Sequence, residues 1–305
     1  MAEIQPNSDD NSIRTTNMPR SPSLLQRIRP TYETIIVDAG ANPTDPTGHY
    51  RPLLGQIPSR LFGFEPQAET TARLNLLHQH QETYLPYLLG DGRLHTLRIC
   101  RASVMTSLLE PDPIACGLFH RFDQLTEVVE RKNVWTRALD DVEEIPRIDH
   151  LKMNVCGSEK MILAHGRNKL SNASVIQLEV SFIPLYQAQP TIGELDLLLR
   201  SFGLIPHAMP LVKTWGVKPL IINNTPGWPV RQLLVAEMVY VADYRKVGQL
   251  PTELLKQMAL ILHYCYHSMD VVLLCLNELA HRKEVDNHPD IWYLDYLRDC
   301  MTAAA

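Results

Sequence analysis

The sequence predicts an α/β fold in which a mostly parallel sheet carries helices on both faces and is followed by a helical extension. Candidate strands and helices alternate between residues 34 and 209, an order that is typical of parallel sheets. The 305 residues are 45% hydrophobic and 21% charged, as in folded domains with a large buried core. Ligands of such sheets bind beyond the carboxyl ends of the strands.

The first 30 residues are rich in Asn, Ser, Asp, Arg and Pro and have no hydrophobic periodicity. Such a segment buries too little apolar surface to offset the entropy that is lost on ordering. We therefore expect residues 1–30 to be a disordered tail. Residues 31–212 are expected to form the sheet domain, and residues 213–305 a mostly helical extension that covers a ligand site or contacts another subunit.

The first elements are predicted from short apolar runs and turn residues. Residues 34–42 contain an apolar run that ends in an acid and a glycine turn, as a buried parallel strand does. A second strand, 61–65, is closed by Pro66. Weak apolar patterns predict helices at 49–57 and 67–80. These elements follow one another in the order strand, helix, strand, helix.

Later candidate strands are also apolar runs, and candidate helices lie between several of them. The strands are 84–89, 96–100, 134–138, 150–155, 175–182 and 205–209. The helices are 158–170 and 192–202. After Pro210, loops with Trp and Pro lead into a long helical region, 252–281, whose apolar side chains repeat at helical spacing.

The charge and cysteine patterns exclude several classes of protein. The formal net charge of −5 argues against a nucleic-acid binder, which needs a basic face. The six cysteines include no Cys-x-x-Cys pair, so a reduced cytoplasmic chain is the simplest interpretation. No apolar run approaches the roughly 18 residues of a membrane helix, and the first residues lack a secretory pattern. We expect a cytoplasmic protein with no membrane or nucleic-acid partner.

Three acids and one glycine follow the predicted strands. Asp38 and Gly40 belong to the turn after the first strand, where a glycine lets the backbone approach a ligand. Glu65 ends the second strand, where a carboxylate can accept two hydrogen bonds from ribose hydroxyls. Asp91 follows a later strand and can accept from an adenine amino group. Together these residues predict a nucleoside pocket.

Each of these residues also has a purely structural interpretation. Asp38 and Gly40 can form an ordinary strand-to-helix turn, Glu65 alone can be a surface acid, and Asp91 can be a turn acid. A dinucleotide fingerprint has three glycines, and only Gly40 is present here. A pyrophosphate site, and with it a nicotinamide-dependent oxidoreductase, is therefore disfavoured. A nucleoside pocket without a phosphate site fits S-adenosylmethionine.

Eight short motifs, in order and with matching spacing, resemble those of the FkbM-type methyltransferases. They are VDAGANP (37–43), GFEPQ (63–67), LPYLLGD (85–91), TSLLEP (106–111), LDD (139–141), IDHLK (148–152), GSE (157–159) and EVSFIPLY (179–186). The resemblance is strong over residues 34–209 and weak over 232–269. It implies a class I methyltransferase with a Rossmann-like, doubly wound, mainly parallel sheet of seven strands that binds S-adenosylmethionine and usually methylates a hydroxyl.

The resemblance also implies roles for individual positions. Asp38, Gly40 and Asn42 would line the methionine end of the cofactor, Glu65 the ribose and Asp91 the adenine. The acceptor would be a hydroxyl on a small molecule or a carbohydrate. The helical extension would cover that acceptor or contact a second subunit.

The chain departs from the family at residue 154. Asn154 follows Lys152 where the family has the aspartate of a Lys-Ile-Asp motif. An asparagine can hold a substrate but cannot take its proton at neutral pH. Other candidates for that proton are Glu159, Glu179 and His207, whose structural alternatives are a helix N-terminal acid, a strand-end acid and a turn histidine. We expect Asn154 to hold the acceptor while Glu159 or Glu179 takes the proton.

The predicted helical extension carries two further patterns. His263 and His267 have the spacing of zinc ligands, but the glutamate of a His-Glu-x-x-His motif and a third ligand are missing. No metal site is therefore predicted. An apolar stripe packs into the core or contacts a second copy of the chain, as in a homodimer. The stripe consists of Met258, Leu262, Cys265 and Met269.

The alternative to an active enzyme is a binding or scaffold protein that keeps the fold, with or without the cofactor. Such a protein would have lost the chemistry with the acid at residue 154. It would have no reason to keep an acid for the ribose, so the presence of Glu65 favours the enzyme.

Overall fold

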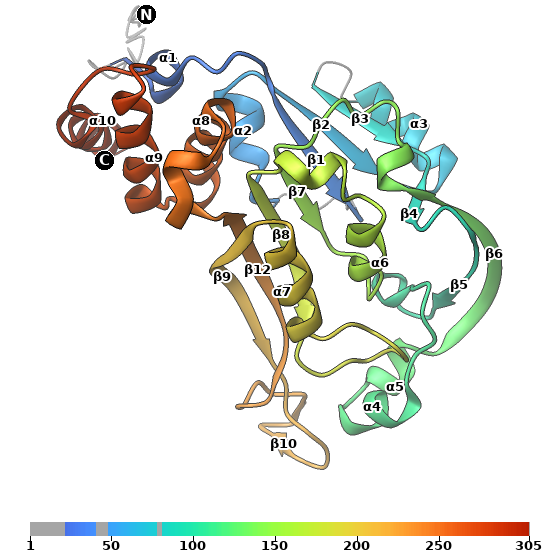
Figure 1. Cartoon of the computed structure of the whole chain (residues 1–305). Coiled ribbons are helices and arrows are strands. Elements are labelled where there is room, and N and C mark those ends of the chain that lie inside the picture. Colours follow the sequence, from blue (N-terminus) through green and yellow to red (C-terminus); the bar gives the residue numbers. More distant parts are fainter. Residues whose placement is uncertain (1–21, 41–47, 78–80, 305) are drawn as a thin grey trace, which may run out of the picture.

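A seven-stranded sheet forms the centre of the computed structural model, which describes residues 22–40, 48–77 and 81–304 (Figure 1). Its strands are β1 (Thr34–Ala39), β2 (Ser59–Phe64), β3 (Glu82–Leu85), β7 (His150–Met153), β8 (Val175–Ser181), β9 (Leu204–Thr214) and β12 (Leu233–Ala242). They lie in the order β3-β2-β1-β7-β8-β12-β9. β12 is antiparallel to both neighbours, and the other strands are parallel. The predicted Rossmann-like α/β class is confirmed.

Helices cover both faces of this sheet. They are α1 (Leu24–Ile28), α2 (Arg51–Gln56), α6 (Glu159–Ala164), α7 (Ile192–Ser201), α8 (Thr252–Ile261) and α9 (Met269–His281). Successive side chains of a strand point to opposite faces. In β1, Ile36 joins one core with α1, α2, α8 and α9, whereas Ile35 and Val37 join the other with α6 and α7. At the sheet edge, α3 (Ala68–Leu77) packs beside β3.

A second sheet of three strands lies beside the central one (Figure 1). It contains β4 (Leu88–Gly90), β5 (Leu94–Cys100) and β6 (Val128–Ala138), and β5 is joined to β6 through η1 (Ser103–Met105), α4 (Pro113–Leu118) and α5 (Phe122–Leu125). We call residues 88–138 the cap. The strands predicted at 96–100 and 134–138 thus lie outside the central sheet. The charged, exposed residues 130–132 of β6 explain why, since a buried parallel strand has no room for them.

The central sheet extends beyond residue 212, where the sequence placed the end of the sheet domain. β12 inserts between β8 and β9, and Val239 and Tyr240 are fully buried on its two faces. The loop from β9 to β12 carries β10 (Ile221–Ile222) and β11 (Thr225–Pro226) and projects from the sheet (Figure 1). The helical extension begins only after β12, at η4 (Tyr244–Gln249).

The long helical region predicted at 252–281 is two helices with a break between them. α8 continues into the π-helical turn η5 (Leu262–Tyr266), and His267 adopts a left-handed backbone (φ 52°) before α9 begins. Three residues of the apolar stripe are buried in the core, whereas Met269 is 44% exposed. Most of the stripe therefore packs within the chain, and the homodimer stays a prediction. α10 (Pro289–Ala304) completes the extension.

Residues 22–30 contain the helix α1, which corrects the disordered tail expected over residues 1–30. α1 begins with a capping box formed by Ser23 and Gln26. Leu24 and Ile28, one turn apart, are fully buried against the helical extension. This helix has five residues, too few for its periodicity to stand out in the sequence. The rest of the expected tail lies outside the described residues.

Two further findings bear on the sequence predictions. All six cysteines are free. No helix of the described residues is long and apolar enough to cross a membrane. The cytoplasmic location and the lack of a nucleic-acid partner stay predictions.

Replacing Leu24 with alanine tests the packing of α1. Because Leu24 is fully buried, we expect Leu24→Ala to lower the free energy of unfolding by about 2–5 kcal/mol, the usual cost of such a cavity. Leu76→Ala on α3 is the matched control, since Leu76 is 71% exposed and its truncation costs about 0.5 kcal/mol or less. Urea denaturation measures both values. Equal, small effects would show that α1 does not pack on the core.

Candidate active site

A cavity of about 490 Å³ lies at the carboxyl ends of β1, β2 and β7. Parallel α/β sheets bind their ligands at this edge, and the volume is within the range of small-molecule sites, about 300–1,000 Å³. Strand ends form one part of the wall and the cap forms another. Lining residues from the strand ends include Gly40, Glu65, Lys152 and Asn154, and those from the cap include Leu97 and Ser107.

Gly40 is required by the close contact of two strand ends. Its backbone has a φ of +80°, and a Cβ at this position would lie 2.1 Å from the carbonyl oxygen of Asn154. The Asn154 amide in turn donates to the carbonyl of Ala39 at 3.0 Å. No other residue fits here without moving the end of β7. The glycine predicted from the sequence therefore shapes the cavity wall.

Glu65 lies on the cavity wall, directly after β2. Its Oε1 accepts from the Gln67 amide at 2.8 Å, which fixes the carboxylate at the start of the next turn. Its Oε2 has no hydrogen-bond partner in the described part of the chain. The side chain is half-buried, so this oxygen can accept from a ligand in the cavity.

Asp38 is buried behind the cavity and is not among its lining residues. The Tyr50 hydroxyl donates to its Oδ2 at 2.6 Å, and the Lys152 ammonium lies 3.0 Å from its Oδ1. Burial and the adjacent carboxylate raise the pKa of Tyr50, which keeps the phenol protonated as a donor. Asp38 thus holds Lys152 at the wall. The predicted contact of Asp38 with the methionine end stays a prediction.

Asp91 also lies off the cavity wall. Its Oδ1 accepts from the Arg93 amide at 3.1 Å and from Thr136 Oγ1 at 3.3 Å, and it lies 2.7 Å from His95 Nε2. Burial opposes ionisation, but the hydrogen bonds from His95 and Arg93 lower the pKa of Asp91. The structure gives this residue the role of holding the turn after β4. Asn42, also predicted at the cofactor, lies outside the described residues.

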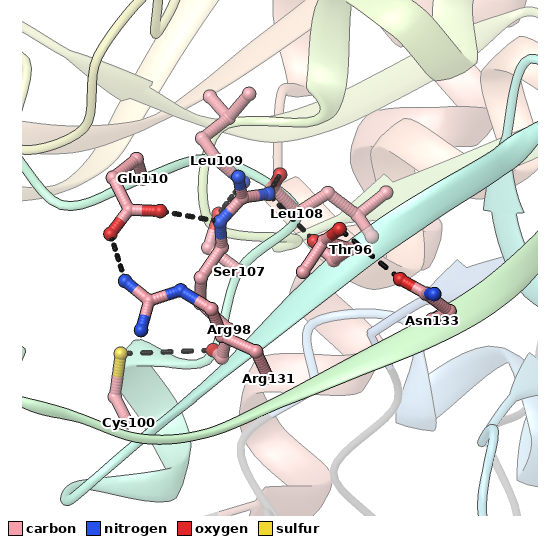
Figure 2. Close-up of polar contacts among 9 residues, drawn as sticks. All are labelled: Thr96, Arg98, Cys100, Ser107, Leu108, Leu109, Glu110, Arg131 and Asn133. Atoms are coloured by element: carbon pink, nitrogen blue, oxygen red, sulfur yellow. Dashed lines mark hydrogen bonds and ion pairs between the residues drawn. The ribbon is translucent and has the colours of Figure 1, made fainter.

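The cap is fixed by an arginine–glutamate–arginine network (Figure 2). Arg98 on β5 donates to Glu110 at 2.8 Å and also to the carbonyls of Thr96 and Leu108. Arg131 on β6 donates to the other oxygen of Glu110 at 2.6 Å. Both arginines lower the pKa of this carboxyl. The segment that carries Ser107 and Leu108 is thereby held against the cavity.

A second set of contacts joins the cap to the turn after β7. Ser107 Oγ donates to the Cys156 carbonyl at 2.6 Å and accepts from the Leu109 amide at 2.9 Å. Cys156 and Gly157 have left-handed backbones, with φ of 51° and 102°, and a Cβ on Gly157 would lie 2.8 Å from Leu109. Sequence reasoning missed these residues as site components, although Ser107 and Gly157 lie in two of the motifs quoted above.

The predicted catalytic residues Asn154 and Glu159 have different surroundings. Asn154 lines the cavity, and its side-chain amide has no hydrogen-bond partner among the described residues. Glu159 begins α6 but is 3% exposed and off the wall. Its Oε1 accepts from the Val155 amide at 3.3 Å. Burial raises the pKa of Glu159 to about 7, and the side chain supports the turn after β7.

Glu179 lies on β8, level with Asn154. The last residues paired between β7 and β8 are Met153 and Leu178, so one step further brings Asn154 and Glu179 side by side. Burial raises the pKa of Glu179, while the charges of Lys213 and Lys152 lower it. In the described part of the chain its carboxylate has no hydrogen bond or ion pair. Glu179 is not among the residues that line the cavity, and its position beside Asn154 is what relates it to the site.

The remaining candidate histidines have partners elsewhere in the fold. His207 on β9 lies 2.6 Å from Ser268 Oγ at the start of α9. His263 Nδ1 lies 2.9 Å from the Tyr293 hydroxyl. Within the described ranges, no group of three or more His, Cys, Asp or Glu side chains is arranged to hold a metal ion.

Comparison with known proteins gives a family match. The model of the methyltransferase FkbM domain matches residues 38–205. No curated protein matches the chain. A precorrin-6y C5,15-methyltransferase from Geobacter metallireducens GS-15 is 13% identical, with 72% of this chain and 85% of that chain covered and a TM-score of 0.34. A methyltransferase FkbM from Methylobacillus flagellatus KT is 14% identical, with 69% and 43% covered and a TM-score of 0.36.

The raised pKa of Glu159 predicts a pH-dependent stability. Folding raises the pKa of this carboxyl from an ordinary value of 4.5 to about 7, so the folded chain binds more protons there than the unfolded chain between these pH values. The contribution of Glu159 to the free energy of unfolding therefore falls by about 3 kcal/mol as the pH rises from 4.5 to 7, and is constant above pH 7.

Glu159→Gln removes this titration but keeps an oxygen that can accept from the Val155 amide. We expect the variant to gain stability relative to the unaltered protein as the pH rises through this range, measured by urea denaturation at each pH. Other titrating groups cancel in the difference. A difference that does not change with pH would show that Glu159 ionises with an ordinary pKa.

Proposed function

Since the chain belongs to the FkbM methyltransferase family, we propose that it is an S-adenosylmethionine-dependent O-methyltransferase that acts on a hydroxyl of a small molecule or sugar. The observation that carries the proposal is the cavity at the carboxyl ends of β1, β2 and β7. At its wall the chain offers a close backbone approach at Gly40 and a Glu65 carboxylate oxygen that has no partner among the described residues.

The cavity wall fits the parts of S-adenosylmethionine. Glu65 would accept from the ribose hydroxyls, because its Oε2 has no partner among the described residues. Apolar residues beside it, Phe64, Leu88 and Leu89, offer a surface for the adenine. Asp91 supports this surface through the turn that it holds, and a contact of Asn42 with the methionine end stays a prediction.

The bound cofactor would supply an electrophilic methyl group on a sulfonium. Asn154 on the wall would hold the acceptor hydroxyl with its free amide. When the methyl group of the cofactor is transferred to the acceptor oxygen with loss of the carbon–sulfur bond, Glu179 would take the hydroxyl proton. The raised pKa of Glu179 suits it to this task, because a general base works best when its pKa approaches the working pH. Holding both reactants in line is the other contribution of the chain.

A second candidate function is that of a protein that binds the cofactor but does not turn over. Asn154 is the observation that favours it, because the resemblance to the family implies an acid at this position. Glu179, level with Asn154 and without a partner among the described residues, is the observation against it. The two functions differ in whether Glu179 is needed for turnover.

Calorimetric titration with S-adenosylmethionine tests the cofactor site. We expect micromolar binding, about −8 kcal/mol, of the cofactor and of its demethylated product, and none of NAD. Glu65→Ala removes the ribose acceptor and should weaken binding at least tenfold, since a hydrogen bond to a charged group contributes about 1.5–3 kcal/mol. Asp295→Asn on α10, an exposed carboxylate, is the control. Unchanged affinity in Glu65→Ala would contradict the ribose assignment, and no binding by the folded protein would contradict the proposed function.

Turnover tests the proton acceptor. With a panel of hydroxylated acceptors and formation of S-adenosylhomocysteine as the readout, we expect Glu179→Gln to lower kcat at least 100-fold, the contribution of a general base. Cofactor affinity should not change. Asn154→Asp should give no gain, because the proton already has an acceptor. A large gain in Asn154→Asp, or full activity in Glu179→Gln, would favour the second candidate or another base.

A further inference from the structure

Two carboxylates face each other on β8 and β12, the two strands that follow β7 in the sheet order. Glu179 on β8 and Glu237 on β12 are directly opposite in the antiparallel register, and both strands lie side by side in the central sheet (Figure 1). Residues in this arrangement have Cβ atoms about 4.5–5.5 Å apart and share one face of the sheet. Like charges directly opposite are destabilising. The pair therefore needs groups that compensate it.

A chain of hydrogen bonds holds one member of the pair. The Tyr266 hydroxyl donates to Gln177 Oε1 at 2.6 Å, and Gln177 Nε2 donates to Glu237 Oε2 at 2.6 Å. His150 Nε2 lies 2.8 Å from the Tyr266 oxygen. Because Tyr266 gives its single proton to Gln177, His150 must be the donor at this oxygen. Every donor in the chain thus points toward Glu237.

His150 fixes the direction of this chain. It is fully buried, and burial lowers its pKa to about 3, so the ring is neutral. With its proton on Nε2, the Nδ1 atom carries none, and Nδ1 has no partner among the described residues. If these hydrogen bonds reversed direction, Gln177 would turn its oxygen toward Glu237, and two acceptors would face each other. The chain of hydrogen bonds therefore orients the Glu237 carboxylate.

The oxygens that remain open define what a ligand must offer. The contacts on Glu237 fall on Oε2, where His49 also lies at 3.7 Å, so Oε1 has no partner in the described part of the chain. Neither oxygen of Glu179 has a hydrogen-bond or ion-pair partner among the described residues. A ligand for the pair must donate hydrogen bonds. Because Lys213 and Lys152 are close enough to lower the pKa of Glu179, a neutral donor fits better than a cation.

We propose that Glu237 is a specificity-determining residue that binds the hydroxyl next to the one that is methylated. This inference rests on the proposed function. The acceptor is then a neutral polyhydroxylated molecule, such as a sugar, with two neighbouring hydroxyls. Glu179 takes the proton of the reacting hydroxyl as its oxygen bonds to the methyl carbon and the carbon–sulfur bond breaks. Glu237 accepts a hydrogen bond from the second hydroxyl. His150, Tyr266 and Gln177 are positioning residues.

The test uses the full chain with S-adenosylmethionine and a panel of neutral methyl glycosides of hexoses and 6-deoxyhexoses. Each glycoside is paired with its monodeoxy derivatives, which lack one hydroxyl. For a glycoside that is methylated, we expect Glu237→Gln to raise KM at least tenfold with kcat changed less than about threefold. Removing the neighbouring hydroxyl from the glycoside should raise KM equally in the unaltered protein. The two changes together should have no further effect, because they remove the same contact.

Further variants separate positioning from folding. Tyr266→Phe breaks the donation to Gln177 and should give a smaller rise in KM than Glu237→Gln. Glu237→Asp keeps a carboxylate but shortens the side chain. It replaces Glu237→Gln in the KM measurement if that variant does not fold. Asp295→Asn is the matched control and should leave KM and kcat unchanged. The comparison of glycosides with their deoxy derivatives needs no variant at all.

The outcomes distinguish this inference from the proposed function. If S-adenosylmethionine does not bind, the proposed function fails. If it binds but no glycoside is methylated, or amine-bearing probes are preferred, the inference about Glu237 is wrong and the cofactor site stands. Equal KM values for glycosides and all of their deoxy derivatives would also overturn it.

Discussion

The contact between the ends of β1 and β7 is the constraint on which the candidate site depends. Gly40 lies so close to the Asn154 carbonyl that even a methyl group would collide with it. The two ends are also joined by the hydrogen bond from the Asn154 amide to Ala39. This closeness places Lys152 and Asn154 beside Gly40 on the cavity wall. The cap contacts the turn after β7 through Ser107 and Cys156, so the end of β7 holds both β1 and the cap.

The acids around this contact differ in how many partners they have within the chain. Asp38 is buried and its two oxygens face Tyr50 and Lys152, so it holds the wall. Glu65 has one oxygen engaged, and Glu179 has none engaged among the described residues. An acid that is partly buried without a donor has a free-energy cost, which a ligand with hydroxyl donors can offset. Open oxygens therefore separate ligand-binding acids from structural ones better than position in a motif does.

The sequence predicted the class of fold, the first two strands and the edge of the sheet that carries the site. It did not predict that β12 inserts between β8 and β9, because strand order depends on pairing between distant segments. Local periodicity also could not separate the cap strands from the central sheet. In the site, Asp38 and Asp91 were predicted as cofactor ligands because an acid next to a glycine is typical of such turns. Their contacts with Lys152 and His95 could not be predicted in the same way, because partners are a property of the folded chain, and the contacts of both acids with the cofactor stay predictions.

The departure at residue 154 and the carboxylate pair are physically linked. The register of β7 and β8 puts residue 154 level with Glu179, and the register of β8 and β12 puts Glu179 opposite Glu237. An aspartate at 154 would add a third negative charge to this row, and the repulsion would grow in a partly buried site. Asparagine avoids that charge and still offers a donor and an acceptor. An asparagine directly after β7 therefore suits a row that already has acids on β8 and β12. It is also compatible with a working proton acceptor.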